Sequence, residues 1–221
     1  GNITLNEGFR ATGEVRLVGA KIAGDLDCTD GVFSNAAKNA LSAPGLIVRG
    51  TCFLRFAEVS TGTMDLTRSR IAYLYDSEPW PEEIILTDCR YDAIFPLSPL
   101  NAESRLRWLK THDRTVRPFH KHAPLDPQPY RWLAEVMRRQ GYEDDAGKVL
   151  RELGWRRWRR SLALRFGRGV RPLSWGVGVG VLLSGLFSGL LIGHGYARWR
   201  PLFWAISMVL AGAIVFSSGD K

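Results

Sequence analysis

The chain has 221 residues and a formal net charge of +8, and its length allows one large or two small domains with a real hydrophobic core. It has three cysteines, Cys28, Cys52 and Cys89. An odd number without a close pair argues against a disulfide framework and against a structural zinc site. We therefore expect reduced thiols in the cytoplasm and no metal or other cofactor. Because the chain begins with Gly1 and not with Met, we expect it to be a fragment or a processed piece.

The charge is divided unequally along the chain. Residues 1–96 hold nine Lys and Arg against thirteen Asp and Glu, a balance of −4, whereas residues 97–221 hold twenty-one against nine, a balance of +12. Much of the excess lies between Arg151 and Arg171, where eight arginines accompany the single acid Glu152. Such asymmetry predicts a basic partner site that is confined to one segment.

A ten-residue module recurs in the first part of the chain, with its starts at Gly13, Gly24, Asn39, Gly50 and Gly62. The third, fifth and tenth residues of every module are apolar, and a weaker copy starts at residue 82. The apolar sets are Val15, Leu17, Ile22; Leu26, Cys28, Phe33; Leu41, Ala43, Val48; Cys52, Leu54, Val59; Met64, Leu66, Ile71; and, in the weaker copy, Ile84, Leu86, Tyr91.

These modules predict a parallel β-solenoid over residues 1–96. Alternation over a few residues is typical of strands, Gly or Asn at a module start is typical of turns, and stacked modules bury a continuous apolar ladder. We assume two modules per coil, and we place a tight corner at the small eighth residue. A β-sandwich is the alternative, but the regular module favours the solenoid. Cys28 and Cys52 occupy module positions that are predicted to face the core. The two prolines of residues 76–83 predict a protruding loop.

Residues 97–168 are expected to form a helical connector. Residues 102–114 follow a capping Asn101, and a second helix starts at Asp126-Pro127 and ends at Gly141. With the helix that follows it forms an αα-hairpin that resembles one tetratricopeptide unit, which we expect to dock on the solenoid or on a partner. His120 and His122 lack nearby further ligands, so we expect a solvated basic loop and no metal site there.

Residues 169–221 are expected to form a transmembrane hairpin. Residues 174–196 contain no charged side chain over 23 residues, about 34 Å of helix, and residues 202–216 form a second, shorter run without charge. The glycines of the first run, Gly185, Gly189 and Gly193, have the spacing that lets helices approach closely, against the second run or against another copy.

The basic segment before the first run predicts a helix at the membrane surface. Trp155 and Trp158 share one helical face with Leu162 and Phe166. The arginines lie mostly elsewhere: Arg156, Arg157, Arg159 and Arg160. Rings at the acyl boundary and arginines on anionic headgroups are typical of interfacial helices, and the positive-inside rule then places the solenoid in the cytoplasm. Nucleic-acid binding by the same residues is the alternative that we set aside.

Three segments of the chain resemble bacterial, actinobacterial-type membrane-associated proteins with an N-terminal β-solenoid related in style to pentapeptide-repeat proteins. The residues that carry the resemblance are 13–33, the hairpin of residues 130–150 and the segment 193–205. The apolar spacing here departs from a strict period of five. The resemblance implies the inner membrane of a bacterial cell as the location, and it implies an oxidoreductase label. Yet the sequence shows neither a cofactor fingerprint nor a redox cysteine pair.

We therefore expect a membrane-anchored cytoplasmic scaffold or interaction module with a protein partner or with a second copy of itself. A solenoid flank and the loop of residues 76–83 would form its partner surface. A membrane-associated oxidoreductase and a channel or transport component built from oligomerised transmembrane helices are the two alternatives.

Overall fold

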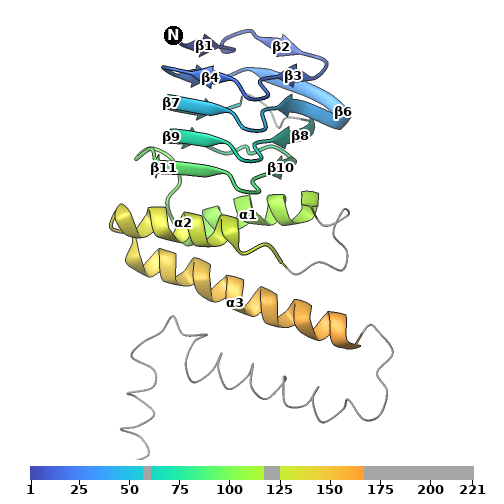
Figure 1. Cartoon of the computed structure of the whole chain (residues 1–221), viewed down its shortest axis with the longest axis vertical. Helices are drawn as coiled ribbons and strands as arrows, with labels where there is room; N and C mark the ends of the chain where they lie inside the picture. Colours follow the sequence, from blue (N-terminus) through green and yellow to red (C-terminus); the bar gives the residue numbers. More distant parts are fainter. Residues whose placement is uncertain (57–60, 117–124, 167–221) are drawn as a thin grey trace, which may run out of the picture. The chain divides into compact units, whose positions relative to one another are not determined.

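A computed structural model describes residues 1–56, 61–116 and 125–166 of the chain (Figure 1). The chain divides into two units, Gly1–Val149 and Leu150–Lys221. Within the described residues the order of elements is a series of short strands followed by three helices. The strands are β1 Ile3–Thr4, β2 Arg10–Ala11, β3 Val15–Arg16, β4 Lys21–Ile22, β5 Leu26–Asp27, β6 Val32–Ser42, β7 Ile47–Leu54, β8 Thr61–Asp65, β9 Arg70–Asp76, β10 Glu83–Ile85 and β11 Arg90–Ile94.

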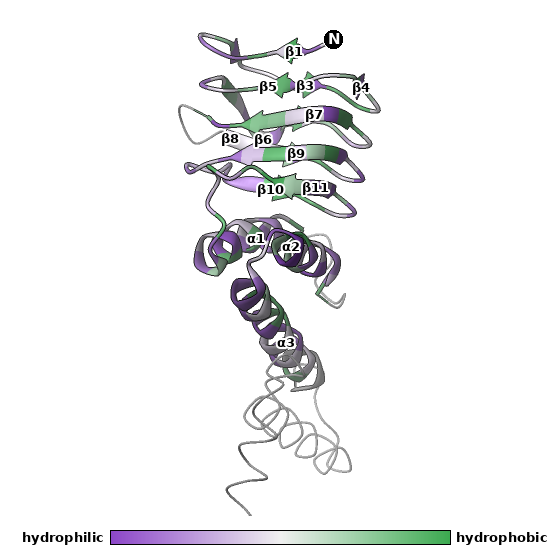
Figure 2. Cartoon of the chain, turned by 90° about the vertical axis from the view of Figure 1, so that its left-hand side faces the viewer, coloured by the Kyte–Doolittle hydropathy of each residue, from purple (hydrophilic) through white to green (hydrophobic). Residues whose placement is uncertain are grey.

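The strands form a parallel β-solenoid, as predicted. One sheet has the order β1-β5-β7-β9-β11, with β4 also paired to β7, and a second has the order β10-β8-β6-β2, with β3 also paired to β6. Every pairing between these described strands is parallel, which rules out the antiparallel sandwich. In Figure 2, β7, β9 and β11 lie one above another, and hydrophilic and hydrophobic residues succeed one another along each strand.

The strand register confirms both the module and the assumption of two modules per coil. The third residues of the modules that start at Gly13, Asn39, Gly62 and residue 82 stack in one column, and their tenth residues stack in another. The first column is Val15, Leu41, Met64 and Ile84. The second is Ile22, Val48, Ile71 and Tyr91, and a third contains Leu26, Cys52, Leu74 and Ile94. Most of these side chains are buried, so each column is a ladder of the core.

The corner of each coil lies one residue earlier than expected. The seventh module residue takes the left-handed conformation, with φ of 70° at Gly45, 56° at Arg68 and 54° at Asp88. The eighth residue closes the turn, as when the N–H of Ser69 donates to the carbonyl of Leu66 at 3.1 Å. Our placement of the corner at the eighth residue is wrong. In several modules that residue is instead part of the core, as are Leu46 and Ser69, which are 0 % exposed.

Three helices follow the solenoid: α1 Ala102–Val116, α2 Gln128–Arg139 and α3 Glu143–Phe166. Asn101 caps α1, because its Oδ1 accepts the N–H of Ser104 at 2.8 Å. Asp126 Oδ1 accepts the N–H of Gln128 at 2.9 Å, so the predicted start of α2 is confirmed. Gly141 ends α2 with φ of 90°, and the N–H of the next residue, Tyr142, bonds to the carbonyl of Met137 at 2.8 Å.

Helices α1 and α2 pack on the last coil of the solenoid, α1 against β10 and α2 against β11 (Figure 1). The apolar stripe of α2 is buried as predicted, with Tyr130 and Leu133 at 0 % exposure. Of the two alternatives for the hairpin, a docked α2 on the solenoid is therefore the one that the structure shows.

The two predicted transmembrane segments, residues 174–196 and 202–216, lie outside the described residues. Among the helices of residues 1–56, 61–116 and 125–166, none is long and apolar enough to cross a bilayer. The domain boundaries at residues 96 and 168 stay predictions.

Candidate functional site

Side chains of the helices satisfy the backbone N–H groups of the last coil. A terminal strand of a solenoid presents a row of unpaired backbone groups that invites pairing with another chain. Here four N–H groups donate to helix side chains: Ile84 to Thr115 Oγ1 at 3.2 Å, Leu86 to His112 Nδ1 at 3.1 Å, Asp88 to Gln128 Oε1 at 3.0 Å and Ile94 to Gln140 Oε1 at 3.1 Å.

Carbonyl groups of the same coil are satisfied in the same way. Cys89 accepts from Gln128 Nε2 at 3.1 Å, Tyr91 from Trp132 Nε1 at 3.0 Å and Ile94 from Gln140 Nε2 at 2.7 Å. Gln128 and Gln140 each donate and accept, as a residue of a neighbouring strand does. We call this set of seven hydrogen bonds the edge closure. It gives the solenoid a closed end, so further strand pairing at this end would require the helices to leave.

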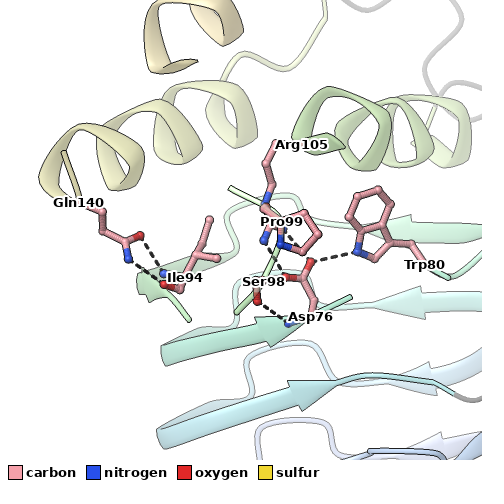
Figure 3. A network of polar contacts seen from close by, with 7 residues as sticks. All are labelled: Asp76, Trp80, Ile94, Ser98, Pro99, Arg105 and Gln140. Carbon is pink, nitrogen blue, oxygen red and sulfur yellow. Dashed lines mark hydrogen bonds and ion pairs between the residues drawn. The ribbon is translucent and has the colours of Figure 1, made fainter. Parts of the chain in front are cut away.

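A buried ion pair holds the start of α1 against the end of β9. Arg105 donates from Nη1 and Nη2 to the two carboxylate oxygens of Asp76, both at 2.7 Å, and from Nε to the carbonyl of Pro99 at 2.6 Å. Both residues are at most 2 % exposed. Trp80 Nε1 donates to Asp76 Oδ2 at 3.2 Å, and the hydroxyl of Ser98 accepts the N–H of Asp76 at 3.1 Å (Figure 3). The bidentate geometry and the additional donors compensate the two buried charges.

This ion pair changes the interpretation of the loop at residues 76–83. The segment between β9 and β10 is a loop, as the prolines predict, but it does not protrude freely. Its first residue, Asp76, is fixed by Arg105, and Glu78 pairs with Arg107 of α1 at 3.1 Å. The expectation that this loop forms a partner surface is wrong at Asp76, because the carboxylate is buried and already pairs with Arg105.

His112 is a buried histidine within the edge closure. Its Nδ1 accepts a backbone N–H, so the neutral ring carries its proton on Nε2. That Nε2 is buried and has no hydrogen-bond partner among the described residues. Burial lowers the pKa of His112, and the carboxylates of Asp113 and Asp126 oppose this shift. A neutral ring is what the geometry requires, since a protonated Nδ1 would face the Leu86 N–H.

A groove of about 490 Å³ lies on the outer face of β7, β9 and β11, next to α2. Arg49, Arg70 and Arg90 line it together with Asp92 and Trp132. The three arginines are exposed, and within residues 1–56, 61–116 and 125–166 no ion pair joins any of them to a carboxylate. Three guanidinium groups against one carboxylate give the groove lining a net charge of +2. We call it the arginine groove.

The indole of Trp132 forms one side of the arginine groove and orients a guanidinium. The Arg90 Cζ lies 5.3 Å from the ring centroid of Trp132, and the Arg139 Cζ lies 5.7 Å from it. Because the indole N–H is bonded to Tyr91, the ring is fixed to the last coil. Cation–π contact and this anchor therefore preorganise Arg90.

The residues predicted for the membrane surface lie on α3. The rings of Trp155 and Trp158 contact each other, with centroids 5.4 Å apart, as expected for residues of one helical face. Arg156 pairs with Glu152 at 2.7 Å and is partly buried, and Arg160 is also partly buried, whereas Arg157 and Arg159 are exposed. The structure does not test lipid contact, which stays a prediction. Gly185, Gly189 and Gly193 lie outside the described residues, as do His120 and His122.

The three cysteines are core residues. Cys28 and Cys52 are 0 % exposed and Cys89 is 3 % exposed, and they form no disulfide. Burial raises the pKa of Cys28 and of Cys89 to about 12 and raises that of Cys52 as well. These thiols are therefore protonated at neutral pH. Among the residues that the structure describes, no group of three or more His, Cys, Asp or Glu side chains could hold a metal ion.

The arginine groove is not among the sites predicted from the sequence, although the repeat contains a signal for it. Lys21, Ile47, Arg70 and Arg90 form one register column, and each is the ninth residue of its module. Three of these four residues are basic. A basic residue that recurs beside an inward-pointing tenth residue indicates an outward cationic stripe.

Comparisons of the chain with protein-family models, with curated proteins and with solved structures find no match. The fold agrees with the β-solenoid that the resemblance to pentapeptide-repeat proteins implies, and the remainder of that resemblance stays a prediction.

Proposed function

We propose that this protein is a non-catalytic scaffold that presents the side of its β-solenoid to a partner protein from the cytoplasmic face of a membrane. The edge closure carries this proposal. Seven side-chain hydrogen bonds and the Arg105–Asp76 pair finish the solenoid at the last coil, so a rigid stack with exposed lateral faces results. Stacked-repeat folds commonly use such extended faces for binding.

The state of the polar side chains also supports a binding role. The groups that most resemble catalytic ones are occupied in the fold: His112 accepts a backbone N–H, Asp76 neutralises Arg105, and the thiols are protonated in the core. By contrast, the arginines of the arginine groove face outward, and no carboxylate in the described part of the chain forms an ion pair with them. Asp76 and His112 thus have partners inside the fold, whereas the charges of the groove are available to a ligand. This distribution suits the binding of a partner.

Support for the membrane part comes from the sequence. The aromatic and basic faces of α3 precede an uncharged 23-residue run, which fits a surface helix followed by a span. Anionic headgroups would bind Arg157 and Arg159, which are exposed. The positive-inside rule then directs the solenoid to the cytoplasm.

Membrane fractionation tests the part of this proposal that concerns the membrane. The full chain and a chain that ends at Pro172 are expressed in bacteria, and the membranes are extracted with carbonate. We expect the full chain to remain in the pellet and the short chain to be released. Protease should cut the solenoid in inverted vesicles and spare it in intact spheroplasts. Release of both chains, or cleavage from the outside, would contradict membrane anchoring and topology, respectively.

A further inference from the structure

We propose that the arginine groove binds an acidic segment of a partner protein, with Arg49, Arg70 and Arg90 as its carboxylate-binding residues. The inference rests on the proposed function, because it names the partner class of the face that the scaffold presents. Arginine forms bidentate hydrogen bonds with carboxylates, and exposed guanidinium groups that share one groove favour a ligand with several negative charges.

The register of the strands determines how the cations are spaced. Arg70 of β9 and Arg90 of β11 are direct neighbours in the parallel ladder, so their Cα atoms are separated by about one strand spacing, ~4.8 Å. Lys21 lies in the same column, and Ile47 separates it from Arg70. An extended peptide that crosses the strands would therefore meet successive cations along its length.

The remaining groups of the groove suit a peptide. Ile47 and Ala72 add apolar surface between the charged residues, which can contact an aliphatic side chain of the ligand. Asp92 adds an acceptor that a peptide N–H or a basic side chain can satisfy. The volume of about 490 Å³ has room for a short segment and not for a folded domain.

The charge distribution favours a protein acid over a nucleic acid. A polynucleotide longer than the groove would run over a domain whose residues 1–96 carry −4 in total and would be repelled there, whereas a short acidic segment needs to contact only the arginines. Asp92 also lines the groove, and its carboxylate disfavours a ligand that carries a negative charge on every unit. The indole of Trp132 already has two guanidinium groups near its ring, at 5.3 and 5.7 Å, which leaves it poorly placed as a stacking platform for bases.

The probe for the test is a fluorescein-labelled peptide of six residues with alternating Glu and Val. Its binding to the full chain in nonionic detergent is followed by fluorescence anisotropy. The groove variant carries Arg70→Glu and Arg90→Glu. The matched control carries Arg10→Glu and Arg16→Glu, which make the same change in charge at exposed positions of β2 and β3 outside the groove.

We expect the Kd of the peptide to rise by about tenfold or more in the groove variant and by no more than about twofold in the control. Arg90 also contacts Trp132, so a second variant, Arg49→Glu with Arg70→Glu, keeps that contact and should lose affinity similarly. Circular dichroism checks that each variant is folded. Equal affinity in all chains would overturn the proposal, because the peptide would then bind without the arginines of the groove.

Two other probes identify a different occupant. A single-stranded oligonucleotide that binds the groove in place of the peptide, and loses affinity in the groove variant, would overturn the proposal in favour of nucleic acid. Vesicles with anionic headgroups that show this dependence would overturn it in favour of lipid. Carbonate extraction of the groove variant separates this inference from the proposed function: a variant that stays in the pellet and binds the peptide normally refutes the groove alone.

Discussion

The Nδ1 atom of His112 in α1 accepts the backbone N–H of Leu86 at 3.1 Å, where another coil would otherwise offer a carbonyl oxygen. The ring is 0 % exposed and lies near the carboxylates of Asp113 and Asp126. One titratable group therefore joins the helices to the end of the solenoid, and its protonation state bears on whether the end stays closed.

Acid should weaken this junction. Burial holds the pKa of His112 below its ordinary value of 6.5, so the unfolded chain binds a proton more readily than the folded one. The contribution of the neutral His112 ring to the unfolding free energy is thus complete above about pH 6.5 and is lost as the pH falls below that value. The unfolding free energy falls by at most about 1.4 kcal/mol per pH unit for this one group. Urea unfolding at pH 7.5 and 5.5 measures this. In His112→Asn, the Oδ1 can still accept the Leu86 N–H but does not titrate. The slope of unfolding free energy against pH should therefore be smaller by up to about 1.4 kcal/mol per pH unit, the value for one proton. An identical pH dependence in both proteins would contradict the assignment.

The Arg105–Asp76 pair should matter far more to stability than its exposed neighbour. Asp76→Asn leaves a buried guanidinium without its counter-charge, which we expect to cost about 3–5 kcal/mol of unfolding free energy. Glu78→Gln breaks the Arg107–Glu78 pair, whose side chains are 53 % and 48 % exposed, and should cost about 0–1 kcal/mol. Both pairs join the same loop region to α1, so the comparison isolates burial. Equal losses in denaturant unfolding would show that the buried pair is not what fixes α1.

Two glycines at the same module position should respond differently to alanine. A Cβ on Gly50 would lie 2.8 Å from backbone atoms of Gly24 in the preceding coil, whereas one on Gly13 would meet nothing within 4 Å. We expect Gly50→Ala to destabilise by about 1–3 kcal/mol, because the coils would have to separate. Gly13→Ala should be neutral or stabilise by up to about 1 kcal/mol, since it restricts the unfolded chain. Thermal unfolding decides this, and a harmless Gly50→Ala would mean that the coils are less closely stacked there.

The sequence was sufficient for the apolar columns and insufficient for the end of the solenoid. Alternation and the ten-residue module identify inward residues such as Met64 and Ile71 because every coil repeats the same local chemistry. The edge closure uses side chains 26 to 46 residues from their backbone partners. In the helical segments, Gln128, Gln140 and Arg105 look like ordinary surface residues. The burial of Arg105 and the backbone contacts of the two glutamines depend on how the helices dock, which no local pattern encodes.

Gln140 offers a direct test of the edge closure, because both ends of its amide bond to Ile94, at 3.1 Å to the N–H and 2.7 Å to the carbonyl (Figure 3). Gln140→Glu keeps the acceptor, removes the donor and places a carboxylate against the Ile94 carbonyl. We expect a loss of about 1–3 kcal/mol and faster amide hydrogen exchange at Ile94, since the end of α2 would open more often. Glu135→Gln makes the reverse change at an exposed site of α2 and should alter neither quantity. Unchanged exchange at Ile94 in Gln140→Glu would mean that apolar packing alone holds α2 on β11.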